Sequence, residues 1–172
     1  MRIEIVDGDT GWPLVGPLEA DVYPPEVMRE VVWRDVEWAH AARRVLAWDG
    51  DVLVCHVGIY ERIGAHDETP ARIAGIGGVM TRNGYRRRGF ASATMERAAG
   101  YMRGAVGADF GLLFCEPHND KFYESLGWTK FEGTALAEKK DATAPFTMMG
   151  AQTLKLKIHP RSGTIDLCGL PW

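Results

Sequence analysis

The stretch TRNGYRRRGFASATMERA, residues 81–98, decides the fold. It follows ARIAGIGGVMT (71–81), a β-rich run that predicts a strand. At Gly89 the spacing of the apolar residues changes. From there to Met102 apolar residues return every three or four positions, which is the period of an amphipathic helix. The stretch therefore predicts a strand, a loop with consecutive arginines, and a helix.

The N-terminal part of the chain predicts a strand, helices and a hairpin. The predicted order is a strand at 2–6, helices or helical turns at 12–20 and 26–40, and a hairpin over 43–63. Pro24-Pro25 separates the two helical segments, since proline removes a helical hydrogen bond. Asp49-Gly50 is a strong tight-turn signal at the centre of the hairpin.

The C-terminal half adds a buried strand, a short helix and later strands. DFGLLFCE (109–116) is mostly apolar, as expected of a central strand. HNDKFYESLGW (118–128) predicts a short helix that Asn119 caps and Gly127 ends. The remaining predictions are strands in WTKFEG (128–133) and QTLKLKIHP (152–160), and a loop over 138–147.

We expect one domain spanning residues 1–172, because a chain of this length forms one sizeable core and no linker divides it. An antiparallel meander followed by a strand–helix–strand unit predicts the α/β (α+β) class. The expected architecture is a mixed, mostly antiparallel central sheet flanked by helices.

Charge and cysteine content argue against several classes of protein. The net charge is -3 and the pI is about 6.0, whereas a general nucleic-acid binder is basic, so no nucleic-acid partner is expected. The three cysteines are far apart and form no CxxC, so no metal site is expected. The N-terminus resembles neither a signal peptide nor a membrane span, which predicts a cytoplasmic protein without a membrane partner.

The arginine loop has the features of an anion site. The first N–H groups of a helix lack partners and lie at the positive end of its dipole, and Gly89 lets the backbone approach a ligand. A P-loop is excluded because Phe90-Ala91 stands where the lysine and the hydroxyl are required. A dinucleotide fingerprint starting at Gly75 and Gly77 fails because Met80 replaces its last glycine.

The remaining pattern, Arg86-x-x-Gly89-x-Ala91, resembles the pyrophosphate loop of the GNAT superfamily of N-acyltransferases, which use acyl-coenzyme A. A second segment, 119–128, is similar to the superfamily's N-x-x-x-[FL]-Y-x-x-x-G-[FW] motif, with one residue fewer before the aromatic pair. The resemblance implies acetyl-coenzyme A as donor. The coenzyme-binding residues that it implies are Val79, Met80, Thr81, Arg86, Arg87, Arg88, Gly89, Phe90, Ala91 and Asn119.

Glycines 75, 77 and 78 are unusual inside a strand, and they indicate a bulge or the close approach of a ligand. With coenzyme A bound, the main chain of Val79 and Thr81 would pair with pantetheine like an added strand.

Within the superfamily the chain looks most like the aminoglycoside 2'-N-acetyltransferases, over residues 35–62, 76–98 and 122–128. The tail, 162–172, is similar to that of the nodulation N-acyltransferase, which acylates a chitin-type amino sugar. The resemblance implies a small-molecule amine acceptor, on an amino sugar or an aminoglycoside. Two departures bear on this specificity: Gly77 stands where those acetyltransferases carry a glutamate, and the acids that bind aminoglycosides are replaced by a tail whose one nearby acid is Asp166.

The resemblance also implies catalytic roles. Tyr123 stands at the position of the superfamily's proton donor to the leaving thiolate, and core packing is its alternative role. The general base stays open between Glu116 and the carboxylate of Trp172, with His56 and His118 as weaker candidates.

The early helix, where this fold places its acceptor lid, carries the candidate substrate-binding residues Trp33, Trp38 and His40. Core packing of the two tryptophans is an equal alternative. Three further alternatives stay open: a non-catalytic acyl-coenzyme A binder, a transferase with a longer acyl donor, and a homodimer.

Overall fold

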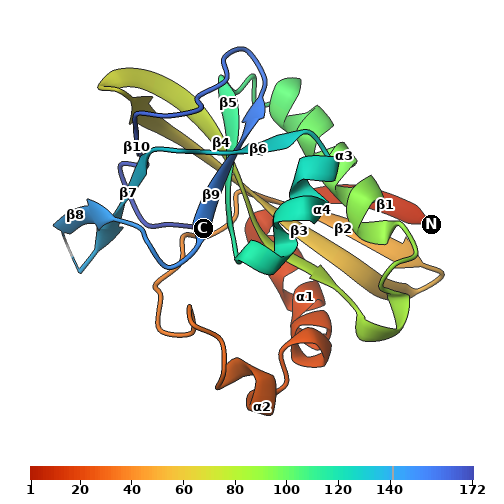
Figure 1. Cartoon of the computed structure of the whole chain (residues 1–172). Helices are drawn as coiled ribbons and strands as arrows, with labels where there is room; N and C mark the ends of the chain where they lie inside the picture. Colours follow the sequence, from red (N-terminus) through yellow and green to blue (C-terminus); the bar gives the residue numbers. More distant parts are fainter. Residues whose placement is uncertain (141) are drawn as a thin grey trace.

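The computed structural model describes residues 1–140 and 142–172 (Figure 1). Its strands are β1 (Arg2–Asp7), β2 (Arg43–Asp49), β3 (Val52–His66), β4 (Thr69–Thr81), β5 (Phe110–Cys115), β6 (Trp128–Lys130), β7 (Thr134–Lys139), β8 (Ala142–Pro145), β9 (Gly150–Lys155) and β10 (Thr164–Asp166). Its helices are α1 (Gly8–Val22), α2 (Pro25–Met28), α3 (Phe90–Arg103) and α4 (Asp120–Ser125), with 3-10 turns η1 (Asn83–Tyr85) and η2 (Pro117–Asn119).

Within the described residues, one ten-stranded sheet runs in the order β6-β9-β5-β4-β3-β10-β7-β8, and β2 and β1 extend it from β3. The central strand β4 pairs antiparallel with β3 and parallel with β5. The pair β7–β10 is also parallel, and the other pairs of this sheet are antiparallel. The prediction of a mixed, mostly antiparallel sheet is therefore confirmed.

Helices cover both faces of the sheet. Met95 and Met102 of α3 are buried in a core that also contains Val45, whereas Leu18 of α1 is buried in a core with Leu46. Neighbouring residues of a strand point to opposite faces, so α3 and α1 lie on opposite sides of β2. Tyr123 of α4 joins the core on the α3 side, where Figure 1 also draws the two helices together.

Helix α1 is longer than the predicted segment 12–20. It begins at Gly8 because the side chain of Asp7 accepts hydrogen bonds from the N–H groups of Asp9 and Thr10 and caps the helix. Its buried positions return every three or four residues, although two prolines lie inside it. Packing of this stripe against the sheet therefore outweighs the low helix propensity of the segment.

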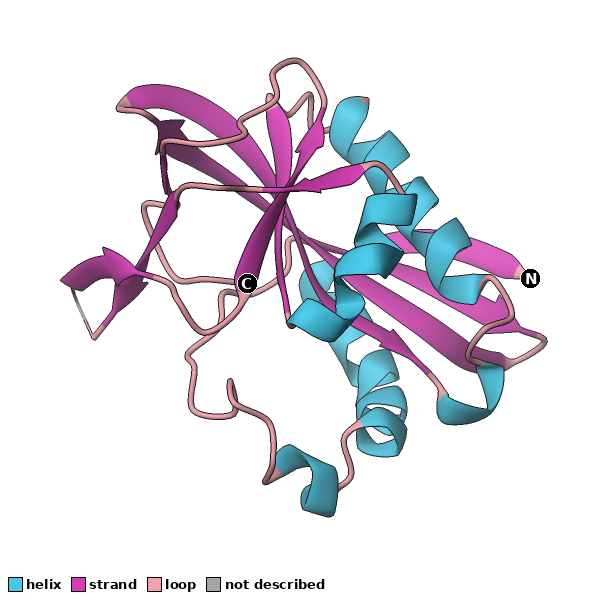
Figure 2. Cartoon of the chain, in the orientation of Figure 1, coloured by secondary structure: helices cyan, strands magenta, loops and turns pink. Residues whose placement is uncertain are grey.

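The segment 26–40, predicted as a helix or helical turns, forms no continuous helix. Helix α2 ends at Met28, and residues 29–42 form turns and irregular backbone, drawn as loop between α2 and the sheet in Figure 2. Contacts with the rest of the fold hold this segment, since the N–H of Ala39 donates to the carbonyl of Pro171 at 2.7 Å. Tertiary contacts rather than helical periodicity set its path.

The loop predicted over 138–147 is also wrong over most of its length. Strands β7 and β8 pair there as an antiparallel hairpin, which projects from one side of the molecule in Figure 1. Ala135 and Ala137 are buried, whereas Glu138 and Lys139 are exposed, so the charges belong to the exposed end of a strand. Asp141, inside the predicted loop, lies outside the described residues.

The glycine-rich part of β4 carries a β-bulge, as one of the two expectations for it required. The pairing with β3 shifts between His56 and Gly58, so that Gly78 and Val79 together oppose one residue of β3. Gly78 has a φ of 57°, in the left-handed region. The bulge interrupts the hydrogen-bonded ladder close to the point where β4 stops pairing with β5.

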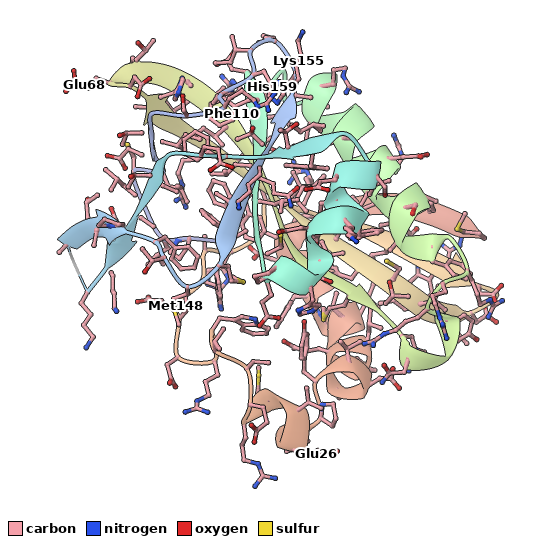
Figure 3. All side chains as sticks on the ribbon, in the orientation of Figure 1. Glu26, Glu68, Phe110, Met148, Lys155 and His159 are labelled. Carbon is pink, nitrogen blue, oxygen red and sulfur yellow. The ribbon has the colours of Figure 1, made fainter. Side chains whose placement is uncertain are left out.

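Side chains on this frame are drawn in Figure 3. Phe110 of β5 is fully buried in the interior, whereas Glu26 of α2 and Glu68 of the turn between β3 and β4 lie at distant edges. Met148 lies on the side where the irregular segment 29–42 runs. This side of the molecule holds the cavity described next.

Candidate active site

A cavity of about 520 Å³ opens where β4 separates from β5. The two strands pair only from Ile73 to Ile76 of β4, and the residues of β4 beyond that point line the cavity as far as Met80. Its other walls come from α1, the segment 29–42, the end of β5, α4 and the tail. The predicted site residues that line it are Val79, Met80, Asn119, Glu116, Tyr123, Trp172, Trp33, Trp38 and His40.

The arginine loop lies beyond this lining, where β4 leads into α3. Thr81 and residues 86–91 do not line the cavity. Arg87 has a φ of 59° and Gly89 a φ of 83°, so two left-handed residues shape the turn. Such a turn directs successive N–H groups into one concave surface, which favours an anion.

The N–H groups of this loop are available to a ligand. Those of residues 86–89 have no acceptor within the described part of the chain, and no side chain caps α3. The side chains are exposed: the Nε of Arg86 donates to the Thr81 carbonyl at 3.3 Å, and Arg88 lies 3.3 Å from the Asp49 carboxylate. The loop thus combines the positive end of the α3 dipole with exposed cationic side chains.

Tyr123 lies in the cavity wall on α4 and is buried. Burial, followed by the nearby Cys115 thiol, raises the pKa of Tyr123, so its hydroxyl stays protonated at neutral pH. This hydroxyl makes no hydrogen bond with any described residue. Asn119 occupies the predicted N-cap position of α4, although its side chain makes no capping hydrogen bond.

Two groups at the end of β5 complete this wall. The Glu116 side chain is 33% exposed, and its carboxylate lies 3.9 Å from the Nε2 of His118. The Cys115 thiol donates to the Asp120 carboxylate at 3.3 Å. Burial and this carboxylate raise the pKa of Cys115 to about 12, which keeps it a thiol rather than a thiolate.

Trp172 is buried and lines the cavity, and Figure 1 marks the chain end close to β9. Its indole stacks on Tyr60 with ring centroids 5.7 Å apart, and its Nε1 donates to the Leu112 carbonyl at 3.2 Å. A Cβ at Gly75 would overlap this indole. The carbonyl carbon of Trp172 would lie 3.0 Å from a Cβ at Gly77, so the tail covers both glycines.

Aromatic rings from the irregular segment line the opposite side. Trp33 contacts Tyr23 edge to face with centroids 5.3 Å apart, and Trp38 lies 6.1 Å from Trp33 and 6.0 Å from Phe146. Both tryptophans are half-buried and line the cavity, and His40 is exposed at its edge. They lie on irregular backbone, so their predicted place on a helix is wrong.

Arg44 and His56 form a buried polar pair in the cavity wall. From the sequence, His56 was named only as a weaker candidate base, and Arg44 was not singled out. The Arg44 Nη1 lies 3.1 Å from the His56 Nε2, and the His56 Nδ1 lies 2.7 Å from the Gly78 carbonyl oxygen. A guanidinium only donates, so Nε2 accepts and Nδ1 carries the proton. An arginine beside the apolar run of β2 was the signal that could have revealed the pair.

Burial, together with the adjacent Arg44 cation, lowers the pKa of His56 to about 4, although the hydrogen bond to the Gly78 carbonyl acts in the opposite direction. His56 is neutral at neutral pH, and both ring nitrogens are engaged. His118 is exposed and does not line the cavity. Neither histidine therefore has the geometry of a base in this cavity.

Two acids of α1, Asp9 and Glu19, also line the cavity, so with Glu116 three carboxylates surround it. Asp166, the acid noted near the tail, lines a different surface pocket. Across residues 1–140 and 142–172, no group of three or more metal-ligating side chains is present, and no helix is both long and apolar enough to cross a membrane.

Comparison with known proteins agrees with this architecture. Residues 20–131, which contain α2 to α4, the arginine loop and β5, match the model of the acetyltransferase (GNAT) domain. A structure from Lactobacillus plantarum described as an N-acetyltransferase is 19% identical, with 90% of this chain and 97% of that chain covered and a TM-score of 0.64.

Two similar structures contain a coenzyme. The Escherichia coli GNAT N-acetyltransferase YhbS, in complex with coenzyme A, is 11% identical over 96% of this chain and 88% of that chain, with a TM-score of 0.63. A Brucella melitensis GNAT acetyltransferase, in complex with acetyl-coenzyme A, is 11% identical over 95% of this chain and 94% of that chain, with a TM-score of 0.60. The chain belongs to the acetyltransferase (GNAT) family and is an acyltransferase.

Proposed function

We propose that the chain moves an acetyl group from acetyl-coenzyme A to a primary amine of a small molecule. One observation carries the proposal: the open half of β4 joins the cavity to the arginine loop with its unpaired N–H groups. This arrangement suits a donor with a polyanionic end and a reactive thioester end. Two of the similar structures hold acetyl-coenzyme A or coenzyme A.

The donor would extend along β4. The pyrophosphate would accept hydrogen bonds from the main chain and side chains of 86–91, which form the positive end of α3. Pantetheine would pair with the main chain of Val79 and Thr81, and Met80 and Asn119 would flank it. This path leads the thioester into the cavity beside Tyr123.

Within the cavity, an N–H of the bulged part of β4 would stabilise the oxyanion that forms as the amine attacks the thioester carbon. The C–S bond then breaks, and Tyr123 would donate its proton to the leaving thiolate. A buried, protonated tyrosine with no hydrogen-bond partner among the described residues is suited to this role.

The base that takes the amine proton would be Glu116 or the main-chain carboxyl group of Trp172. Both line the cavity, and Trp172 lies beside Gly77, where the aminoglycoside acetyltransferases carry a glutamate. Glu116→Gln distinguishes them: loss of the acidic limb of the kcat/KM pH profile assigns the base to Glu116. An unchanged profile assigns it to Trp172.

Direct transfer to the amine is favoured over an acetyl-enzyme. Cys115 is the cysteine that lines the cavity, and its raised pKa makes it a poor nucleophile. Cys55 is also buried, and burial raises its pKa.

The acceptor would be a cationic, sugar-like amine. Half-buried Trp33 and Trp38 offer ring faces and edges for a sugar, and Asp9, Glu19 and Glu116 attract a cation before it loses its proton. These features support the amino-sugar or aminoglycoside class, although the supporting acids come from α1 and from the residue after β5 rather than from the tail.

A thiol-release screen with acetyl-coenzyme A tests the proposal. Amino sugars, aminoglycosides and polyamines are supplied as acceptors, and titration calorimetry measures donor binding separately. We expect release with an amino sugar. Donor binding without release with any amine would favour a non-catalytic acyl-coenzyme A binder, and turnover of polyamines alone would exclude the sugar class.

A further inference from the structure

A buried chain of hydrogen bonds runs from α1 to the bulge of β4. The Arg44 Nε donates to the Gly8 carbonyl at 2.6 Å, and its Nη1 donates to the His56 Nε2 at 3.1 Å. The His56 Nδ1 donates to the Gly78 carbonyl at 2.7 Å. Arg44 is 6% exposed and His56 is 1% exposed, so water competes little for these bonds.

The last of these hydrogen bonds, from His56 to the Gly78 carbonyl, acts on one peptide group. In a planar trans peptide, the C=O of Gly78 and the N–H of Val79 point in opposite directions. The hydrogen bond holds the Gly78 carbonyl toward the His56 ring. The Val79 N–H therefore points away from that ring.

This peptide needs such a restraint. The bulge removes the regular ladder bond that would otherwise hold a strand peptide in place. Gly78 occupies the left-handed region and has no side chain to limit rotation, although a Cβ there would come within 3.3 Å of the His56 ring. Beyond Ile76, β5 no longer pairs with β4 on the other side.

We propose that His56, fixed by Arg44, is a positioning residue that holds the Gly78–Val79 peptide so that the Val79 N–H donates to the thioester oxyanion. His56 acts through the main chain and exchanges no proton with the reactants. The inference rests on the proposed acetyl transfer, because it assigns a donor for the oxyanion of that reaction.

Three variants test the positioning role. His56→Leu removes both hydrogen bonds at similar volume, and His56→Asn restores an N–H donor at the position of Nδ1. His66→Leu is the matched control, because His66 also bonds through a ring nitrogen to a main-chain carbonyl, that of Ser162 at 3.0 Å, outside the cavity. We expect His56→Leu to lower kcat roughly 100-fold, as loss of an oxyanion donor does. Acetyl-coenzyme A affinity should be unchanged, His56→Asn should recover most of the rate, and His66→Leu should match the wild type.

Infrared spectroscopy can detect the hydrogen bond from the oxyanion donor to the bound thioester without turnover. In isotope-edited infrared spectra, the thioester carbonyl of bound acetyl-coenzyme A should absorb at lower frequency than free donor in the wild type and in His56→Asn. In His56→Leu it should return toward the free value. An unchanged frequency and an unchanged kcat in folded His56→Leu would overturn the proposal.

If His56→Leu does not fold, nitrogen NMR of the wild-type histidine ring decides the point. A proton on Nδ1 with a bare Nε2, together with the lowered carbonyl frequency, supports the proposal, and the opposite tautomer overturns it. The failure of the proposed function is distinct: the wild type would then bind acetyl-coenzyme A without releasing thiol to any amine, while the ring tautomer stayed as described.

Discussion

The two walls of the cavity are built in different ways. The donor wall comes from β4, the end of β5 and α4, whose regular geometry fixes it, and β4 leads on to the arginine loop and α3 outside the cavity. The acceptor wall comes from three distant segments, α1, residues 29–42 and the tail, and aromatic contacts and single hydrogen bonds join them.

The difference in construction suits two functions: the regular wall binds the reacting donor, and the irregular wall selects the acceptor. A wall made of consecutive regular elements keeps one geometry, which suits a donor that is the same in every turnover. A wall made of distant irregular segments can change by local substitution without disturbing the sheet. We therefore expect changes on the donor wall to affect kcat or donor affinity, and changes on the acceptor wall to affect the acceptor KM.

The largest effect is expected from the reacting centre of the donor wall. Tyr123→Phe should lower kcat by about 100-fold or more, as loss of a general acid does, and should leave acetyl-coenzyme A affinity unchanged. Steady-state kinetics and calorimetry measure the two quantities. Phe122→Leu, on the same helix, is a packing control that should keep kcat. Wild-type turnover in Tyr123→Phe would show that Tyr123 is not the general acid.

A second effect concerns the buried histidine between the two walls. The pKa of His56 is about 4 in the folded protein and near 6.5 when unfolded, so the unfolded chain takes up the proton first as the pH falls. Between these values the free energy of unfolding should fall by about 3 kcal/mol through this group alone. Above pH 6.5 this group adds no pH dependence.

Urea denaturation at several pH values measures this loss. Acids elsewhere in the protein also titrate, so the quantity is the difference between the wild type and His56→Asn, which lacks the proton site. A difference that does not change between pH 7 and pH 4.5 would show that His56 titrates normally.

A single methyl group added at Gly75 should disturb the acceptor wall. In Gly75→Ala the new Cβ would overlap the indole of Trp172 and displace it, at a cost of about 1–3 kcal/mol in the free energy of unfolding. The acceptor KM should rise while donor affinity stays constant. Gly16→Ala, on α1 with open space around it, is the control and should not destabilise the protein. Equal losses of donor and acceptor binding in Gly75→Ala would show that the walls are not independent.

The smallest effect is expected at the arginine loop. Gly89→Val places a branched side chain at a φ of 83° and should distort the loop, weakening acetyl-coenzyme A binding about tenfold, or ~1.4 kcal/mol. Gly107→Val introduces similar strain at a φ of 61°, in open space after α3. It should lower stability without changing donor affinity. Equal donor affinities in the two variants would argue against an anion site at this loop.

The same division explains how far the sequence could predict the molecule. The hairpin of β2 and β3, the strand β4, helix α3 and strand β5 follow from local periodicity and turn residues, and the structure has all of them. Strand β4 forms much of the donor wall. Val79, Asn119 and Tyr123 were predicted from the resemblance to the superfamily's motifs rather than from periodicity, and all three line one cavity.

The acceptor wall was predicted poorly because its determinants are not local. Residues 29–42 have helix-like spacing but are held by distant partners, such as the Pro171 carbonyl for the Ala39 N–H. The pair of Arg44 and His56 meets only through strand register, which places the two residues on one face of neighbouring strands. The acids of α1 reach the cavity through a helix whose glycines and prolines concealed its start.

A single-turnover experiment tests the central claim most directly. Enzyme in excess is mixed with isotope-labelled acetyl-coenzyme A and the best acceptor from the screen, quenched over time, and the label is followed by mass spectrometry in the donor, the acceptor and the protein. We predict that each acetyl group lost from the donor appears at once as an amide on the acceptor, with none on the protein. A transient acetyl group on Cys115, or loss of the label to water without amide, would contradict direct acetyl transfer in this cavity.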